Sequence, residues 1–392
     1  MNFDFDTDQL SLRAEFRRFF EKACDLRVVR RIAEGDDAVT AGLADDLRSL
    51  GMAGLAVPAA AGGLGLGPLE LCIAAEEAGR ALVPGPLIAS AGPATLALCR
   101  YAGPDVQAAW LPRLAGGDAS AAVVLRPLHD SALVERGLLT LTKHRLNGFC
   151  SPAADMAAAD LLIVECVNEI SGEPALVCIE RNAPGVTVRS LKSADPTRTT
   201  SELVCSDVQA QLLCAGPAAR QAAEWLRRAW AVFIAFEQLG MAESALAMAV
   251  RYAQERRTFG RVIGSYQAIK HKLTDVFVSI QLARAHAYFA AWALVAAEDR
   301  LPLAAAAARV ACTEASMLAA QENIQTHGGI GYTWEADCHF FYKRARYYAA
   351  VIGSSAYWRS ELAVHLRGAS RAEPAPPTLD SQGAPDGLQR YA

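Results

Sequence analysis

The sequence of 392 residues is long enough for two or three domains, or for one large unit with several layers. With 52% hydrophobic and 20% charged residues, it has the composition of an ordinary globular protein. The formal net charge of -4 provides no electrostatic footprint for nucleic acid or for an anionic membrane surface, so we expect neither as a partner.

Ten cysteines are scattered without a CxxC pair or a regular spacing, which argues against both a zinc site and a disulfide framework. Free thiols of this kind behave as small apolar residues and indicate a reducing compartment. The acidic N-terminus MNFDFDTDQL has no apolar signal core, and no uncharged apolar run reaches membrane-spanning length. We therefore expect a cytoplasmic protein without a metal site.

The first half of the chain divides into a helical part and a β part. Residues 1–118 are predicted to be helical, because segments such as QLSLRAEFRRFFEKAC place apolar residues three and four positions apart. In residues 119–213, short apolar or alternating runs are separated by Asn-Gly, Ser-Gly and Pro-Gly pairs, which predicts a small β domain. No helical crossovers separate these runs, so a parallel nucleotide-binding sheet is not expected.

Helical periodicity returns over residues 214–368. Ile269, Leu273, Val276 and Ile280 form an apolar stripe with the spacing of a bundle helix, and several such helices predict a helical bundle. Residues 369–392 are rich in Pro, Gly, Ala and polar residues, which predicts a flexible tail.

The segment ERRTFGRVIGSYQ, at 255–267, lies between two predicted helices. Taken alone, it is an interhelical turn with a basic flank. Its functional interpretation is a nucleotide site, in which Arg256 binds a phosphate, Phe259 contacts a flat ring and Gln267 bonds to a ring edge or a ribose. Both interpretations are open at this point.

The segment QTHGGIGYTWEADCHFFYKRAR, at 325–346, interrupts alanine-rich helices with three glycines. Glycines before a helix let backbone N–H groups approach an anion, although a tight helix contact also requires glycine. His327 has no HxxxH or HxH partner, so we expect a packed or hydrogen-bonded histidine rather than a metal ligand. Glu335 and Asp337 are explained by favourable charge at a helix start.

The two segments together, in this domain order, strongly resemble the acyl-CoA dehydrogenase family over residues 1–368. The resemblance implies a multi-domain α+β fold with an N-terminal helical domain, a middle β-barrel or sandwich domain and a C-terminal four-helix bundle, which enclose FAD. It also implies that the C-terminal motifs of one subunit hold the ADP half of the flavin bound mainly by its neighbour. On that resemblance, the cofactor-binding candidates are Arg256, Phe259, Gln267, Gln325, Gly328 and Gly329.

The family reaction needs a desolvated glutamate that removes the α-proton of an acyl-CoA, and this chain departs from the family at that base. In the commonest arrangement the glutamate follows the basic helix, where this sequence has Ile352. A second arrangement places it 29 residues before the phenylalanine, where this sequence has Trp230. The nearest acid on that helix is Glu237, about 10 Å further along. Glu237 is a candidate for a relocated base, or else a partner in an interhelical hydrogen bond or salt bridge.

The β domain also departs from the family pattern. Members that hold the flavin ring usually carry a Trp-x-Thr or Trp-x-Ser segment after the Asn-Gly of this hairpin, whereas Asn147-Gly148 is followed here by FCSPAADMAAAD. In both respects the chain is similar to the base-lacking subunit of bacterial steroid side-chain acyl-CoA dehydrogenases, which work as α2β2 heterotetramers.

Three hypotheses follow from this resemblance. The first is a subunit that dehydrogenates a bulky steroid-derived or branched acyl-CoA only with a second acyl-CoA dehydrogenase-like chain, and that passes electrons to an electron-transfer acceptor. The second is a self-sufficient homo-oligomer that uses Glu237 as its base. The third is a non-catalytic structural subunit.

Overall fold

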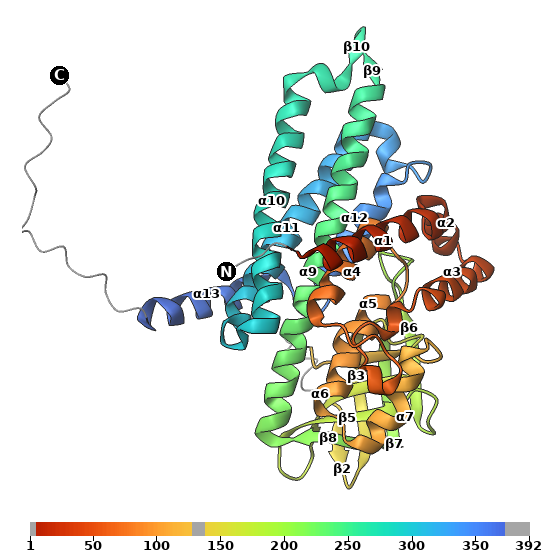
Figure 1. Ribbon diagram of the computed structural model, residues 1–392, viewed down its shortest axis with the longest axis vertical. Helices are drawn as coiled ribbons and strands as arrows, with labels where there is room; N and C mark the ends of the chain where they lie inside the picture. Colours follow the sequence, from red (N-terminus) through yellow and green to blue (C-terminus); the bar gives the residue numbers. More distant parts are fainter. Residues whose placement is uncertain (1–4, 128–137, 373–392) are drawn as a thin grey trace, which may run out of the picture.

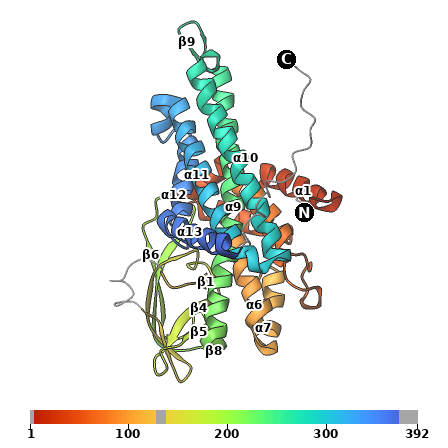
Figure 2. The same ribbon diagram turned by 90° about the vertical axis from the view of Figure 1, so that its left-hand side faces the viewer.

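The computed structural model describes residues 5–127 and 138–372. A group of N-terminal helices is followed by a sheet and then by long helices, which confirms the predicted fold class (Figure 1). The sheet lies toward one end of the elongated molecule, and a helical hairpin extends to the other end (Figures 1 and 2). Most of the predicted tail lies outside the described residues.

The N-terminal helices begin at side chains that cap them. Asp6, Asp25 and Asp36 each accept hydrogen bonds from backbone N–H groups in the first turn of the helix that follows, groups that have no partner within the helix. The helices are α1 (Thr7–Ala23), α2 (Leu26–Ala33), α3 (Asp37–Ser49), α4 (Pro68–Arg80), α5 (Leu87–Ala89), α6 (Thr95–Tyr101) and α7 (Pro104–Ala115).

The sheet has strands β1 (Ala121–Val124), β2 (Thr140–Thr142), β3 (Arg145–Ala154), β4 (Leu161–Asn168), β5 (Pro174–Glu180), β6 (Val186–Leu191), β7 (Thr200–Gln209) and β8 (Gln211–Ala215). Their order is β6-β7-β3-β2-β4-β5-β8, and β1 pairs with β4. The pairs β1–β4 and β2–β4 are parallel, and the other pairs are antiparallel. The sheet is therefore mixed, a feature that alternation along single strands does not reveal.

Strand β4 is buried on both faces. Leu161 and Ile163 pack into the helical core, whereas Leu162 and Val164 belong to a second core formed by the β domain itself. Because neighbouring side chains on a strand point to opposite faces, one strand joins both cores.

The C-terminal part consists of α9 (Gly216–Glu255), α10 (Gln267–Ala296), α11 (Leu301–His327), α12 (Cys338–Ala350) and α13 (Ser355–Ala372), with the short hairpin β9 (Arg257–Thr258) and β10 (Arg261–Val262). By length and composition alone, Gly216–Glu255 and Glu298–Tyr332 could span a membrane. However, 72% and 61% of their most apolar windows are buried in the structure, as in core helices.

Helices α4 and α9 cross at two glycines. A Cβ atom added to Gly240 would lie 1.8 Å from the carbonyl oxygen of Glu76, and one added to Gly79 would lie 2.0 Å from that of Glu237. The two backbones approach too closely for any larger residue. This contact joins the N-terminal helices to the bundle.

We expect Gly240→Ala to lower the free energy of unfolding by about 1–3 kcal/mol, because the added methyl group forces the two helices apart. The matched control is Gly42→Ala in α3, where an added Cβ meets nothing within 4 Å. That change is expected to raise the free energy of unfolding by roughly 0.5–1 kcal/mol. Urea unfolding followed by circular dichroism measures both, and equal stability of the two variants would contradict the prediction.

Candidate functional site

A cavity of ≈ 490 Å³ lies between the sheet and the bundle. Strands β1 and β3, the segment between β6 and β7, helix α9 and the end of α12 all contribute to it. Ile352 and Trp230, the two positions at which the sequence lacks the family's glutamate, both line this cavity. The two departures therefore concern one site.

The cavity is bordered by cationic side chains, namely those of Arg126, Lys192, Arg227 and Arg346. Among the described residues that line it, none is Asp or Glu. Glu165 lies close by, with a carboxylate oxygen 3.5 Å from an Nη atom of Arg227. The arrangement suits an anionic ligand with an apolar part.

The buried Arg309 fixes the loop that carries Ile352 through hydrogen bonds. One guanidinium nitrogen of Arg309 donates to Gln238, at 2.8 Å, and to Thr313, at 2.5 Å. The other donates to the carbonyl oxygens of Tyr348 and Val351. Burial lowers the pKa of Arg309 to about 10, so it stays charged at neutral pH. The end of α12 is thereby fixed against α9 and α11.

Ile352 itself has a positive φ of 55°, which is an outlier for a β-branched residue. Such a conformation persists only where the surroundings enforce it. The loop beside the cavity is thus sharply bent, and its side chain at position 352 is apolar. Ile352 cannot take up a proton, so it cannot act as the base.

Glu237 lies in a buried network rather than at the cavity. Its carboxylate accepts a hydrogen bond from the Tyr348 hydroxyl at 2.7 Å and one from Arg198 at 3.2 Å. Arg198 also donates to Asp155, at 3.1 Å through Nε. Burial raises the pKa of Glu237, although Arg198 and Tyr348 act to lower it. Its role as a relocated base stays a prediction, and its observed contacts are those of an internal ion pair.

The hairpin β9–β10 carries the first set of predicted cofactor residues. Arg256 follows α9 directly, and its backbone N–H donates to the Tyr252 carbonyl oxygen at 2.8 Å. Phe259 is 92% exposed and has a positive φ of 52°. Gln267 is the first residue of α10 and is exposed. These three residues are thus exposed, and the β9–β10 hairpin lies at the end of the helical hairpin formed by α9 and α10 (Figure 1).

The glycine turn carries the second set. Gln325 is exposed near the end of α11, and Gly328, which follows that helix, has a φ of 66°, where glycine is favoured. A Cβ added to Gly328 or Gly329 would meet nothing within 4 Å, so both face open space. Gly331 differs, because its added Cβ would lie 2.7 Å from the carbonyl oxygen of Ile324. Packing explains Gly331, whereas it does not explain Gly329.

His327 connects the two sets. Its Nδ1 lies 2.8 Å from the Asn323 carbonyl oxygen, and its ring stacks on Tyr252 with centroids 4.1 Å apart. Tyr252 is one turn before Arg256, so the two sets lie at the same end of the bundle. The prediction of a packed, hydrogen-bonded histidine agrees with these contacts.

The predicted cofactor residue Arg256 follows the C-terminal end of α9, whereas the cavity lies beside the first half of this helix. Trp230 and Arg256 are 26 residues apart on this helix, which is about 39 Å at 1.5 Å per residue. The sheet and the β9–β10 hairpin are correspondingly distant (Figure 1). A single dinucleotide bound to one chain cannot reach both places.

Two buried networks could not be predicted from the sequence, apart from the expectation that Glu237 takes part in a hydrogen bond or salt bridge. The first contains Arg198 with Asp155, Glu237 and Tyr348. In the second, Arg344 pairs with Asp195 and donates to the Leu82 and Val83 carbonyl oxygens, which joins all three parts of the chain. Their members are far apart in sequence and belong to no motif, so only the fold brings them together.

The chain thus combines N-terminal helices, a mixed sheet and a helical bundle, with a cationic cavity between the sheet and the bundle. The family model for the N-terminal domain of acyl-CoA dehydrogenases matches residues 6–118, and the family model for their C-terminal domain matches residues 228–366. Acyl-CoA dehydrogenase IpdE2 of Mycobacterium tuberculosis is 34% identical over 305 residues, which are 78% of this chain and 80% of that protein. The chain belongs to the acyl-CoA dehydrogenase family of oxidoreductases that act on acyl-CoA, whose members are generally flavoproteins.

Solved structures agree with this assignment. A chain of the ChsE4-ChsE5 complex from Mycobacterium tuberculosis matches with a TM-score of 0.85 and 24% identity, covering 96% of this chain and 100% of that one. A chain of the steroid acyl-CoA dehydrogenase Tcur3481-Tcur3483 matches with a TM-score of 0.82 and 25% identity, covering 93% and 99%.

Proposed function

We propose that this chain is the base-lacking subunit of a heteromeric acyl-CoA dehydrogenase. The observation that carries the proposal is the pair Ile352 and Trp230, which line one cavity where the family's two arrangements each need a glutamate. A second chain of the same family supplies the base. The similar structures named as pairs, ChsE4-ChsE5 and Tcur3481-Tcur3483, support a partner of this kind.

We further propose that the complex binds FAD at a site shared between chains. When bound, FAD accepts the hydride in α,β-dehydrogenation of the acyl-CoA. Arg256 is suited to a phosphate, Phe259 to a flat ring and Gln267 to hydrogen bonds at its edge. Gln325 with Gly328 and Gly329 would complete the pocket for the ADP half. These groups face outward and lie far from the chain's own cavity, so they suit a flavin whose ring is in the neighbouring chain.

The proposed substrate is a bulky, steroid-derived acyl-CoA. The name of Tcur3481-Tcur3483 as a steroid acyl-CoA dehydrogenase supports this class. In this chain Trp230 and Ile352 present apolar side chains to the cavity, and none of its described lining residues is a carboxylate that could act as the base. We therefore assign the acyl group to the partner's side of the composite site. An electron-transfer acceptor reoxidises the flavin.

Co-expression with a family-like partner chain tests the proposal. We expect a complex with the mass of two copies of each chain and a yellow flavin spectrum, whereas the separate chain binds FAD poorly. A chain that forms only homo-oligomers with full flavin content would contradict the proposal. A chain that stays colourless with every partner and with added FAD would instead indicate the structural-subunit role.

One observation favours a second function, a self-sufficient enzyme with Glu237 as its base. Glu237 is 4% exposed, and this burial raises its pKa, as a general base requires. Glu237→Gln would then abolish flavin reduction by acyl-CoA while the flavin absorbance stays intact. Unchanged reduction in the variant excludes this function.

A further inference from the structure

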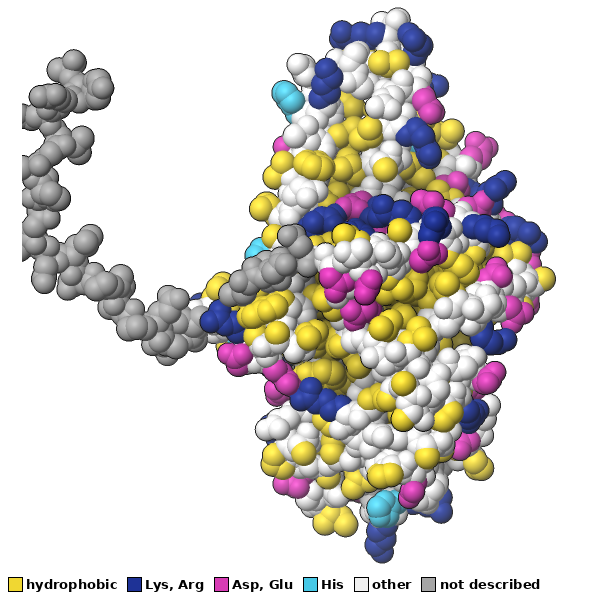
Figure 3. Space-filling model, in the orientation of Figure 1, with side chains coloured by type: hydrophobic (Ala, Val, Ile, Leu, Met, Phe, Trp, Pro, Cys, Tyr) yellow, Lys and Arg dark blue, Asp and Glu magenta, His cyan; other side chains and the backbone are white. Residues whose placement is uncertain are grey.

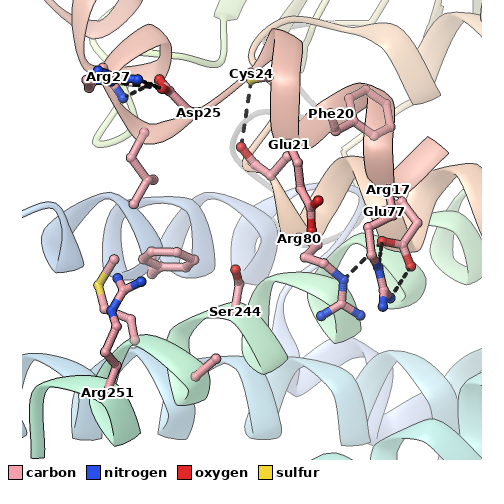
Figure 4. A pocket seen from close by; sticks show the side chains of 15 residues that line it. Arg17, Phe20, Glu21, Cys24, Asp25, Arg27, Glu77, Arg80, Ser244 and Arg251 are labelled. Carbon is pink, nitrogen blue, oxygen red and sulfur yellow. Dashed lines mark hydrogen bonds and ion pairs between the residues drawn. The ribbon is translucent and has the colours of Figure 1, made fainter. Parts of the chain in front are cut away.

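A second cavity, of ≈ 640 Å³, lies where α1 and α2 meet α4, α9 and α12. It shares no residue with the cavity that contains Ile352. Helix α9 contributes one wall, formed by Ser244, Ala247, Met248 and Arg251, whose three- and four-residue spacing places them on one helix face. Figure 4 shows Ser244 and Arg251 extending from α9 on the same side, below the α1–α2 segment. The volume is that of a small-molecule site.

The inner surface of this cavity is apolar. Phe20 from α1 and Phe341 from α12 are each 1% exposed overall and line it with their rings. Leu26 and Met248 are half-buried beside them. The apolar part of a ligand would therefore contact apolar side chains from α1, α2, α9 and α12.

The charged groups of the cavity are mostly paired with one another. Arg17 and Arg80 both donate to Glu77, and Arg27 donates to Asp25. Burial alone would raise the pKa of Glu77, but the hydrogen bond from Arg17 and the charge of Arg80 hold it below its ordinary value. Glu77 is therefore ionised at neutral pH and neutralises part of the charge of these arginines.

Arg251 of α9 and Glu21 of α1 are the exceptions. Both line the cavity, and neither side chain makes a hydrogen bond or ion pair with any residue that the structure describes. Four arginines line the cavity against Glu21, Asp25 and Glu77, which leaves one positive charge in excess. An adjoining groove adds Arg13, Arg18 and Arg284 against the single further carboxylate of Glu243. Lys and Arg side chains accordingly gather in a band at the level of α1 (Figure 3).

We propose that this cavity binds a small amphipathic carboxylate. Its carboxylate group pairs with Arg251 and accepts a hydrogen bond from the Ser244 hydroxyl, while its apolar body packs on Met248 and Phe341. A guanidinium without a protein partner, beside an apolar surface, is the combination that selects a monoanion over a neutral ligand. The site is independent of the proposed dehydrogenase role, because it contains neither base position and none of the predicted cofactor residues.

The test uses decanoate as the probe and isothermal titration calorimetry on the full chain, in whichever complex it is purified. We expect saturable binding of one decanoate per chain, weakened by added salt. Arg251→Gln should raise the Kd at least about tenfold, the loss expected for a hydrogen-bonded charge pair. Ala247→Trp should abolish binding, because the indole fills the cavity from an exposed position.

The control variant is Arg189→Gln, on an exposed part of β6, which should bind decanoate as the unaltered chain does. Decanol, which lacks the charge, should bind at least about tenfold more weakly and should not respond to Arg251→Gln. The proposal is overturned by absent or non-saturable decanoate binding, by binding that survives Ala247→Trp, or by equal losses in Arg251→Gln and Arg189→Gln.

Discussion

Arg198→Met is expected to lower the free energy of unfolding by about 3–5 kcal/mol, because it leaves two buried carboxylates without their shared partner. Arg198 is 4% exposed and donates to Asp155, Glu237 and the Tyr348 hydroxyl. Methionine fills much of the same volume, so the effect reports the lost charge rather than a large void. Urea unfolding at neutral pH gives the measurement.

The control is Arg189→Met, which removes a single ion pair with Glu202 whose arginine side chain is 66% exposed. Such exposed pairs contribute at most about 1 kcal/mol, so this variant should remain close to the unaltered chain. If Arg198→Met unfolds at the same urea concentration as Arg189→Met, the network does not stabilise the fold as its geometry indicates.

Arg256→Glu is expected to reduce the affinity of the complex for FAD by at least about tenfold. The change removes a charge-assisted hydrogen bond to a phosphate and adds a repulsive charge. The Arg256 side chain is exposed, and the backbone contacts of this residue to Tyr252 and Ile263 are independent of it. The hairpin should therefore keep its conformation. Flavin absorbance per mole of purified complex measures the loss.

Arg300→Glu is the matched control, since Arg300 is also exposed but lies just before α11, at the other end of that helix from the glycine turn. It should retain the full flavin content. Retention of flavin by Arg256→Glu, or an equal loss in both variants, would rule out the predicted phosphate contact.

Much of the fold could be predicted from apolar periodicity. The stripe on α10 illustrates both the success and the limit of that reasoning. Val276 and Ile280 are each 1% exposed, as the spacing predicts, whereas the apolar Phe277 and Leu282 are 53% and 62% exposed. Periodicity identifies the buried face of a helix, but it does not explain apolar residues that lie outside that face.

The only site positions that could be predicted are those that lie a fixed number of residues from a sequence motif. Counting from two motifs led to Ile352 and Trp230, and both line the same cavity. The network around Glu237 could not be found in this way, because Asp155, Arg198 and Tyr348 come from the β domain and from α12. Buried charge pairs have no sequence spacing of their own, so their partners emerge only from the packing.

The most direct test of the missing base is single-turnover reduction of the flavin by a steroid-derived acyl-CoA without oxygen. It compares the separate chain, saturated with FAD, with the complex that contains the partner chain. We predict rapid bleaching of the flavin in the complex and none in the separate chain on the same time scale. Bleaching of the separate chain at the rate of the complex would show that it has its own base and would contradict the account.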